Sequence, residues 1–150
     1  MDLLDQELIK LLSQDAAQSN QIIAKKLKVT TATIRRRKWQ LIKNGALRIL
    51  GAVNPVKIGY GVTVVVTFDV EGGRLDSAIK LLSSRPEITW VSTTTGRFDI
   101  IALVRLQSTD ELSQFISDTV SSIEGLRNSE TFVCLSVAKG KFSLMFSDSK

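Results

Sequence analysis

The spacing of hydrophobic residues in the first 43 positions predicts three short helices. The apolar stripe of the first helix consists of Leu4, Leu8, Leu11 and Leu12. Ser19 can cap a second helix, and Thr30 or Thr31 can cap a third that ends at about Lys43, before an Asn-Gly pair. Only a short turn separates the second helix from the third, which is rich in Lys and Arg. This arrangement is typical of a helix-turn-helix domain that binds DNA.

The hydrophobic period changes after residue 61. Alternating or β-branched residues predict strands over 62–70, 88–95, 98–106 and 129–137, and helical spacing predicts helices over 75–82 and 112–123. The order strand-helix-strand-strand-helix-strand is that of the ferredoxin-like α+β unit. A further short strand is expected at Phe142–Phe146.

Glycine and proline mark the boundary between these two halves. A short strand is expected over Leu47–Val53, which would give the first domain a winged-helix-like character, and Gly51, Pro55, Gly59 and Gly61 interrupt the segment from 51 to 61. We therefore divide the chain into a helix-turn-helix domain at 1–50, a hinge at 51–61 and a ferredoxin-like domain at 62–150.

The composition excludes several kinds of site. The chain has 150 residues, of which 43% are hydrophobic and 23% charged, so it can bury a core. It contains no histidine and one cysteine, which removes imidazole catalysis, His metal sites and internal disulfides. No apolar run reaches the ~18 residues that span a bilayer, and the first residues are acidic, unlike a signal peptide. We expect a cytoplasmic protein that is not an enzyme and has no cofactor, metal or membrane partner.

Positive charge is concentrated in the first part of the chain. Residues 1–60 hold 11 Lys and Arg against 4 Asp and Glu, whereas residues 61–150 hold 9 against 11. Such a field attracts polyanions, of which nucleic acid is the commonest inside cells. The alternative is a solvated cationic face with no partner.

The third helix carries the residues expected to meet double-stranded DNA. Small and polar residues in its first two turns allow close approach to a major groove, where Arg35 and Arg36 can contact guanine and threonines can contact base edges. The surrounding lysines suit phosphates. The candidate DNA contacts are Lys25, Lys28, Thr30, Thr31, Thr33, Arg35, Arg36, Arg37, Lys38 and Lys43.

The apolar side of the same helix is expected to consist of Ile34, Leu41 and Ile42. Trp39 has two interpretations. It can complete the core of a small domain that is poor in aromatic residues, which we favour, or it can lie at a subunit interface.

Both halves of the chain resemble the Lrp/AsnC family, the feast/famine transcription regulators. The N-terminal match runs through Leu4-Asp5, Ile23-Ala24, Val29-Thr30, Ile34, Arg36-Arg37 and Gly45. The C-terminal match comprises Thr94-Thr95-Gly96-Arg97-Phe98-Asp99 and Ser129-Glu130-Thr131-Phe132-Val133-Cys134-Leu135. One departure is Lys38 followed by Trp39, where the family has an aliphatic residue after the paired arginines.

The resemblance implies a sequence-specific DNA-binding transcription regulator. It also implies homodimers that assemble into tetramers or octamers, and an effector, an amino acid or related metabolite, bound at the C-terminal domain interface. Independently, a four-stranded sheet with both helices on one face leaves an apolar face bare, and a two-fold dimer would cover it. Two alternatives remain: an enzyme subunit similar to siroheme decarboxylase, which the absence of histidine disfavours, and an architectural DNA-binding protein.

The turn before the third predicted strand offers donors and acceptors for a free amino acid. Hydroxyls, backbone N–H groups and Arg97 can take a carboxylate, while Asp99 can accept from an ammonium. By resemblance, two residues of the last strand lie nearby. The candidate effector residues are Thr94, Thr95, Gly96, Arg97, Asp99, Ser129 and Thr131. The alternative is an ordinary hairpin in which Gly96 adopts a positive φ.

Overall fold

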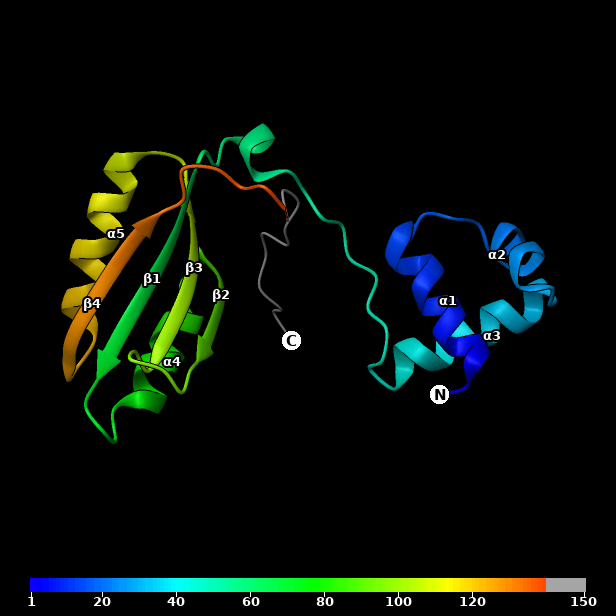
Figure 1. Ribbon diagram of the computed structural model, residues 1–150, viewed down its shortest axis with the longest axis horizontal. Coiled ribbons are helices and arrows are strands. Elements are labelled where there is room, and N and C mark those ends of the chain that lie inside the picture. Colours follow the sequence, from blue (N-terminus) through cyan, green and yellow to red (C-terminus); the bar gives the residue numbers. More distant parts are fainter. Residues whose placement is uncertain (140–150) are drawn as a thin grey trace. The chain divides into compact units, whose positions relative to one another are not determined.

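The chain folds into two compact units. The computed structural model describes residues 1–139, and these divide into a unit of residues Met1–Leu50 and a second unit that starts at Gly51 (Figure 1). No helix in the described part of the chain combines the length and apolar character needed to cross a membrane.

The N-terminal unit consists of three helices, as predicted. They are α1 (Leu3–Gln14), α2 (Asn20–Leu27) and α3 (Thr31–Lys43). Each begins at a side chain that accepts a backbone N–H: Asp2, Ser19 and Thr30, respectively. Leucine and isoleucine side chains at helical spacing fill the space between the helices. The fully or nearly fully buried ones are Leu8, Leu12, Ile23, Ile34 and Leu41.

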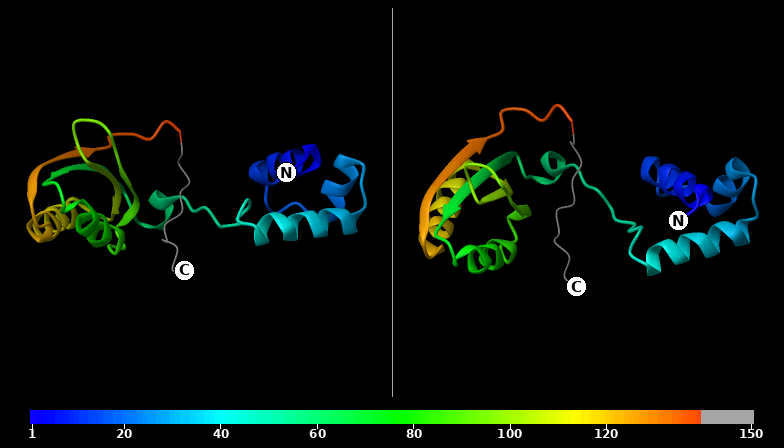
Figure 2. Two further views of the ribbon diagram at one scale, coloured as in Figure 1. Left: turned by 90° about the horizontal axis from the view of Figure 1, so that it is seen from below. Right: turned by 60° about the horizontal axis from the view of Figure 1, so that its bottom comes forward.

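The C-terminal unit has the predicted strand and helix order. Its elements are β1 (Val62–Val70), α4 (Leu75–Ser83), β2 (Ile88–Thr93), β3 (Ile100–Leu106), α5 (Thr109–Ser122) and β4 (Leu126–Val133). The strands form one antiparallel sheet in the order β2-β3-β1-β4, and both helices cover the same face of it (Figure 2). This arrangement confirms the ferredoxin-like α+β prediction.

The strand alternation determines which face of the sheet is buried. Val64, Val66 and Phe68 of β1 are fully buried, and they pack with helix residues such as Ala78 and Phe115. The intervening residues of β1 lie on the opposite face, because successive side chains of a strand point to opposite sides. The helices therefore leave one face of the sheet without a covering layer from this unit.

The strand predicted over Leu47–Val53 was wrong. Residues 47–52 have no regular secondary structure, and Val53 forms only an isolated bridge. The segment has a β-type sequence, but a strand needs a neighbour to accept and donate its backbone hydrogen bonds. Instead, a 3-10 turn at Pro55–Ile58 leads into β1.

The boundaries of three other strands differ from the prediction. The last strand starts three residues earlier than predicted and ends at Val133, because it pairs with β1 from Leu126 onward. The second strand ends at Thr93, two residues early, and the third starts at Ile100, two residues late, because the turn between them takes up more of the chain than expected. The strand expected at Phe142–Phe146 lies outside the described residues.

The favoured placement of Trp39 in the core was wrong, as was that of Ile42. Their exposed fractions are 57% and 46%. In a helix packed on one side only, the core-facing stripe is narrow, and Ile34 and Leu41 already occupy it. Instead, the Trp39 ring lies under the ammonium group of Lys43, 4.8 Å from its centroid.

Candidate nucleic-acid interface and effector loop

A tight turn joins α2 to α3. Lys28 adopts a left-handed backbone conformation, with φ at 54°, and its N–H donates to the Ala24 carbonyl at the end of α2. The Val29 N–H donates to the same carbonyl over 3.1 Å. This cap ends α2 abruptly and lets α3 start three residues later, which is the geometry of a helix-turn-helix.

Two of the threonines predicted to contact DNA, Thr30 and Thr33, form the cap at the start of α3. The Thr30 hydroxyl accepts the Thr33 N–H over 3.1 Å, and the two hydroxyls lie 2.9 Å apart. These hydroxyls therefore already take part in hydrogen bonds within the protein. Thr31 is half-buried beside them.

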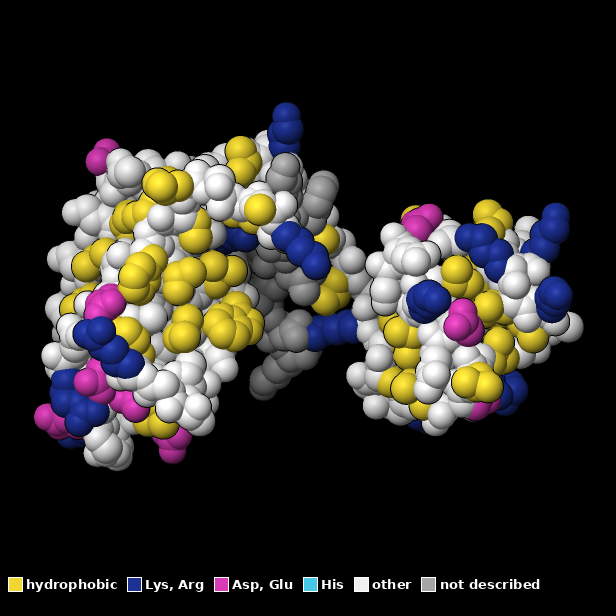
Figure 3. All heavy atoms as spheres, viewed as in Figure 1, with side chains coloured by type: hydrophobic (Ala, Val, Ile, Leu, Met, Phe, Trp, Pro, Cys, Tyr) yellow, Lys and Arg dark blue, Asp and Glu magenta, His cyan; other side chains and the backbone are white. Residues whose placement is uncertain are grey.

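The outward face of α3 is cationic. Arg35 and Arg36 are exposed in its second turn and Lys43 is exposed at its end, while Lys38 is half-buried. Lys25 and Lys28 are exposed at the end of α2. Several of the Lys and Arg side chains of this unit stand out from its surface in Figure 3. The structure thus places most of the predicted DNA contacts on α3 and on the turn before it.

Arg37 is the exception among these cations. Its guanidinium lies 2.8 Å from Asp2 Oδ2 and 3.3 Å from Asp5 Oδ1, so it is turned toward α1. No local pattern in the sequence marks a partner 32 residues away. Because two carboxylates already pair with its terminal nitrogens, we leave Arg37 out of the proposed DNA contacts.

The segment between β2 and β3 is a hairpin held by its own hydrogen bonds. The Thr94 N–H donates to the Asp99 carbonyl over 2.9 Å, and the Thr94 hydroxyl donates to the Phe98 carbonyl. The Asp99 carboxylate accepts the Val70 N–H over 2.9 Å. Gly96 is not among the glycines with positive φ. Thr95, Gly96 and Arg97 are exposed at the tip.

Charged side chains from β1 and β4 surround this hairpin. Arg127 lies 2.6 Å from Asp69 Oδ1 and 3.7 Å from Asp99 Oδ2, and Arg97 lies 3.0 Å from Glu130 Oε1. The hydrogen bond from Arg127 holds the pKa of Asp69 below its ordinary value, and Asp69 in turn raises the pKa of Arg127. The sequence analysis missed Asp69, Arg127 and Glu130, because only the sheet register brings β1 and β4 together.

The remaining two predicted effector residues lie on the other side of the sheet. In the pairing of β4 with β1, Ser129 is opposite Phe68 and Thr131 is opposite Val66, so both share the helix-covered face. Glu130, the partner of Arg97, lies between them in sequence and therefore on the opposite face. The structure brings Thr94, Thr95, Gly96, Arg97 and Asp99 together in the hairpin, but it does not bring Ser129 and Thr131 to the Arg97 side.

The uncovered face of the sheet carries a row of large apolar side chains. In the strand register, Trp90 pairs with Leu103, Leu103 with Val65 and Val65 with Phe132, so the row crosses all four strands. Trp90 is 53% exposed and Phe132 is 50% exposed. Figure 3 shows hydrophobic side chains gathered over the strands of this unit. We call these four residues the apolar row.

Within residues 1–139, no group of three or more acidic or Cys side chains is placed to hold a metal ion. The features that bear on the predicted DNA, effector and subunit contacts are the cationic helix, the charged hairpin and the apolar sheet face.

Comparison with known proteins accounts for both units. Residues 1–41 match the model of the AsnC-type helix-turn-helix domain, and residues 63–144 match that of the Lrp/AsnC ligand binding domain. An HTH-type transcriptional regulator of Pyrococcus furiosus is 33% identical over 97% of this chain and 99% of its own length. Curated relatives of this kind bear the names of transcription regulators, in agreement with the expectation of a protein that is not an enzyme.

Solved structures show the same fold. Escherichia coli AsnC superimposes with a TM-score of 0.84 at 25% identity, covering 92% of this chain and 94% of that one. A transcriptional regulator from Neisseria meningitidis, solved in complex with L-Met, superimposes with a TM-score of 0.85 at 18% identity over 93% and 92% of the two chains. The chain belongs to the Lrp/AsnC family of transcription regulators, with an AsnC-type helix-turn-helix domain followed by the family's ligand-binding domain.

Proposed function

We propose that this protein is a sequence-specific regulator that binds double-stranded DNA through α3 as a homodimer, and that an amino acid or related metabolite at the C-terminal domain modulates this binding. The observation that carries the proposal is the exposed pair Arg35 and Arg36 in the second turn of α3, the helix that follows the tight turn. Arg side chains at this place in a helix-turn-helix are positioned to reach guanine edges in a major groove.

The other cations divide by position. The lysines on either side of the first two turns of α3 suit contacts to DNA phosphates, which supply affinity without sequence information. They are Lys25, Lys28, Lys38 and Lys43. Thr31 and the cap formed by Thr30 and Thr33 present the start of α3, where a helix N-terminus also favours a phosphate.

The direct test is selection of bound sequences from a randomised duplex pool, followed by fluorescence anisotropy on the selected site at several salt concentrations. Arg35→Gln and Arg36→Gln should each weaken binding to the selected site by about 5- to 150-fold, equivalent to ~1–3 kcal/mol, and relax the base preference. Lys80→Gln, an exposed cation on α4, is the matched control and should leave binding unchanged. Binding that neither variant weakens would contradict the proposal.

The apolar row supports the homodimer. A second copy related by a two-fold axis would cover Trp90, Leu103, Val65 and Phe132 with the same residues of its partner, which is the simplest way to remove this surface from water. Such a dimer presents two helix-turn-helix units, which can bind half-sites about one helical turn, ~34 Å, apart. We extend the proposal to tetramers or octamers of this dimer, because the resemblance to the Lrp/AsnC family implies such assemblies.

Sedimentation equilibrium tests the dimer. Trp90→Glu places a charge in the apolar row and should yield a monomer whose affinity for the full DNA site falls at least tenfold, because two half-sites are no longer bound together. Ser83→Glu adds the same charge on exposed α4 and should remain a dimer. A wild-type protein that sediments as a monomer at micromolar concentration would contradict the proposal.

The charged hairpin supports an effector site. Arg97 is exposed at the tip and can take a carboxylate, while Asp99 can accept from an ammonium with the oxygen not bonded to Val70. The neisserial regulator was solved with L-Met, so a protein of this fold does bind an amino acid. Calorimetry with each of the twenty L-amino acids should detect binding that Arg97→Gln weakens about tenfold. A bound amino acid that leaves DNA affinity unchanged would contradict its role as an effector.

A further inference from the structure

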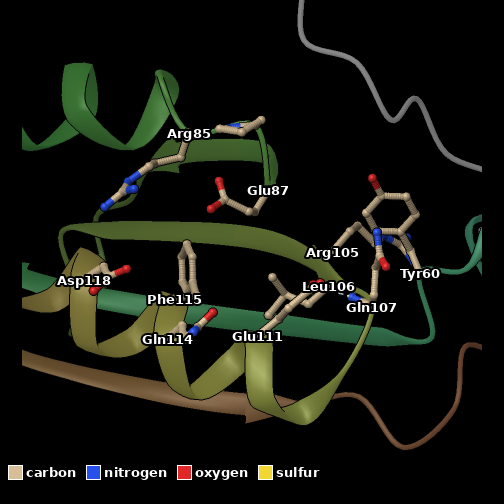
Figure 4. A pocket seen from close by; sticks show the side chains of 11 residues that line it. Tyr60, Arg85, Glu87, Arg105, Leu106, Gln107, Glu111, Gln114, Phe115 and Asp118 are labelled. Atoms are coloured by element: carbon tan, nitrogen blue, oxygen red, sulfur yellow. Dashed lines mark hydrogen bonds between the residues drawn. The ribbon is translucent and has the colours of Figure 1, made fainter.

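A second pocket lies in the C-terminal unit, at the end of β3 opposite to the charged hairpin. The hairpin precedes Ile100, where β3 starts, whereas the pocket is lined by Leu106 and Gln107, where β3 ends. It has a volume of about 350 Å³ and lies between α5 and the turn that joins α4 to β2 (Figure 4). This is large enough for a small metabolite.

Two charged side chains of that turn reach into the pocket without partners. Arg85 Nε and Glu87 Oε2 are inaccessible to solvent, and within residues 1–139 neither side chain forms a hydrogen bond or ion pair. Figure 4 shows that they are not paired with each other: Arg85 extends toward Asp118, and the Glu87 carboxylate points into the space above Phe115. Both residues are half-buried, and each has one inaccessible polar atom without a partner, so a ligand that supplies an acceptor to Arg85 and a donor to Glu87 would be favoured here.

Arg105 also lines the pocket, but its side chain belongs to the opposite face of the sheet. It is paired with Thr63 in the register of β3 with β1, next to the helix-facing Val104, and its Nη1 donates to the Thr63 hydroxyl over 2.7 Å. The unpartnered charged groups on the helix-covered side of the pocket are therefore those of Arg85 and Glu87.

The backbone that carries these side chains is fixed. The Arg105 N–H donates to the Glu87 carbonyl over 2.9 Å, and the Arg85 N–H donates to the Leu82 carbonyl over 3.2 Å. Pro86 separates Arg85 from Glu87 and restricts the backbone between them. The backbone that carries the two charges is therefore ordered before any ligand arrives, which lowers the entropic cost of binding.

The charges around the pocket define the ligand. Arg85 needs an anionic acceptor, and a guanidinium matches a carboxylate. Glu87 needs a donor, and α5 adds two further carboxylates to the lining, Asp118 on the side of Arg85 (Figure 4) and Glu111. A phosphate would be repelled by these three carboxylates, and a simple amine would leave Arg85 unsatisfied. Phe115 and Pro86 provide an apolar wall for the remainder of the ligand.

We propose that this pocket is a second ligand site, distinct from the charged hairpin, that binds a small zwitterion by pairing its carboxylate with Arg85 and its ammonium with Glu87. The ligand's apolar part lies against Phe115. This site does not depend on the proposed role of the hairpin or on DNA binding, and it would allow one chain to carry two small molecules at the same time.

Nuclear magnetic resonance on the full-length, ¹⁵N-labelled protein tests this site. Each of the twenty L-amino acids is added singly at a concentration on the order of 10 mM, high enough to saturate a site of millimolar affinity. For each one that binds, the amine and the 2-hydroxy acid with the same side chain are titrated in parallel. At least one amino acid should shift the amides of Arg85, Glu87 and Asp118, and its amine and hydroxy-acid counterparts should bind at least tenfold more weakly. No shift in these amides with any of the twenty, or equal binding of the hydroxy acid, would overturn the proposal.

Variants separate this site from the hairpin. Arg85→Gln and Glu87→Gln should each weaken binding at the pocket at least tenfold, whereas Arg97→Gln in the hairpin and Lys80→Gln on α4 should change it less than twofold. Because Arg85 and Glu87 have no partners to lose, the ligand-free variants should melt at or above the wild-type temperature, so loss of binding cannot be attributed to misfolding. If Arg97→Gln abolishes the pocket shifts while Arg85→Gln leaves them intact, the proposal fails.

Discussion

Arg37 in α3 and Asp5 in α1 form an ion pair across the N-terminal unit, with Arg37 Nη1 lying 3.3 Å from Asp5 Oδ1. Asp5 also takes part in the capping box that starts α1, because its carboxylate accepts the Asp2 N–H over 3.1 Å. One cation of the helix expected to contact DNA thus serves to hold that helix against its neighbour. The adjacent Arg36 is exposed.

Replacing Arg37 should therefore affect stability, while replacing Arg36 should affect binding. Arg37→Gln leaves the largely buried Asp5 carboxylate without its partner and should lower the free energy of unfolding of the N-terminal unit by about 1–2 kcal/mol, allowing for partial exposure. Arg36→Gln, the control, should stay within about 0.5 kcal/mol of wild type. Urea denaturation followed by circular dichroism measures both, and an equal loss in the two variants would contradict this division.

Lys28 has a strained left-handed backbone, and it also carries one of the positive charges proposed to contact DNA phosphates. Lys28→Gly relieves the left-handed conformation at φ 54° and should raise the free energy of unfolding by about 0.5–1 kcal/mol. The same change removes a cation, so the slope of log affinity for DNA against log salt should become shallower by about 1 if Lys28 contacts a phosphate. Lys28→Gln is the control, because it removes the charge but keeps the strain. A Gly variant that is no more stable than the Gln variant would refute the strain argument.

Gly125 is required by a close approach between β4 and the turn after β1. Its φ is +70°, its carbonyl accepts the Glu71 N–H over 2.8 Å, and a Cβ there would lie 2.9 Å from Arg74 Cγ. Gly125→Ala should destabilise the C-terminal unit by about 1–2 kcal/mol, since both the backbone and the neighbouring side chains resist the added methyl group. At Gly72 a Cβ would meet no atom within 4 Å, so Gly72→Ala should change the thermal midpoint very little. Equal midpoints for the two variants would rule out this explanation.

The Asp69–Arg127 pair predicts a pH dependence. Hydrogen bonding to Arg127 lowers the folded-state pKa of Asp69 below its ordinary value of 3.8, so the pair stabilises the fold above that value. This contribution is lost as the pH falls below 3.8 through the lowered pKa. Asp69→Asn should therefore make the thermal midpoint less dependent on pH between about 5 and about 2.5, as measured by circular dichroism. Glu7→Gln in the exposed part of α1 is the control, and a slope that Asp69→Asn leaves unchanged would contradict the prediction.

The sequence by itself determined the elements and their order. The alternation through Val64, Val66 and Phe68 predicted a half-buried strand, and Ser19 and Thr30 marked helix starts that the structure confirms. Periodicity and capping depend on residues within one or two turns of each other, so the chain displays them directly. The helix predicted over 112–123 starts three residues earlier, at Thr109. The resemblance to the family, carried by the order of its motifs, was visible for the same reason.

The tertiary structure decided which side chains meet. The Asp5–Arg37 and Asp69–Arg127 pairs join residues 32 and 58 positions apart. Only helix packing and sheet register bring such partners together, and no local pattern encodes either one. The same holds for the apolar row, which exists only because four strands align, and for the unpaired charges of Arg85 and Glu87. Trp39 was misplaced because hydrophobicity alone does not tell how many sides of a helix are covered.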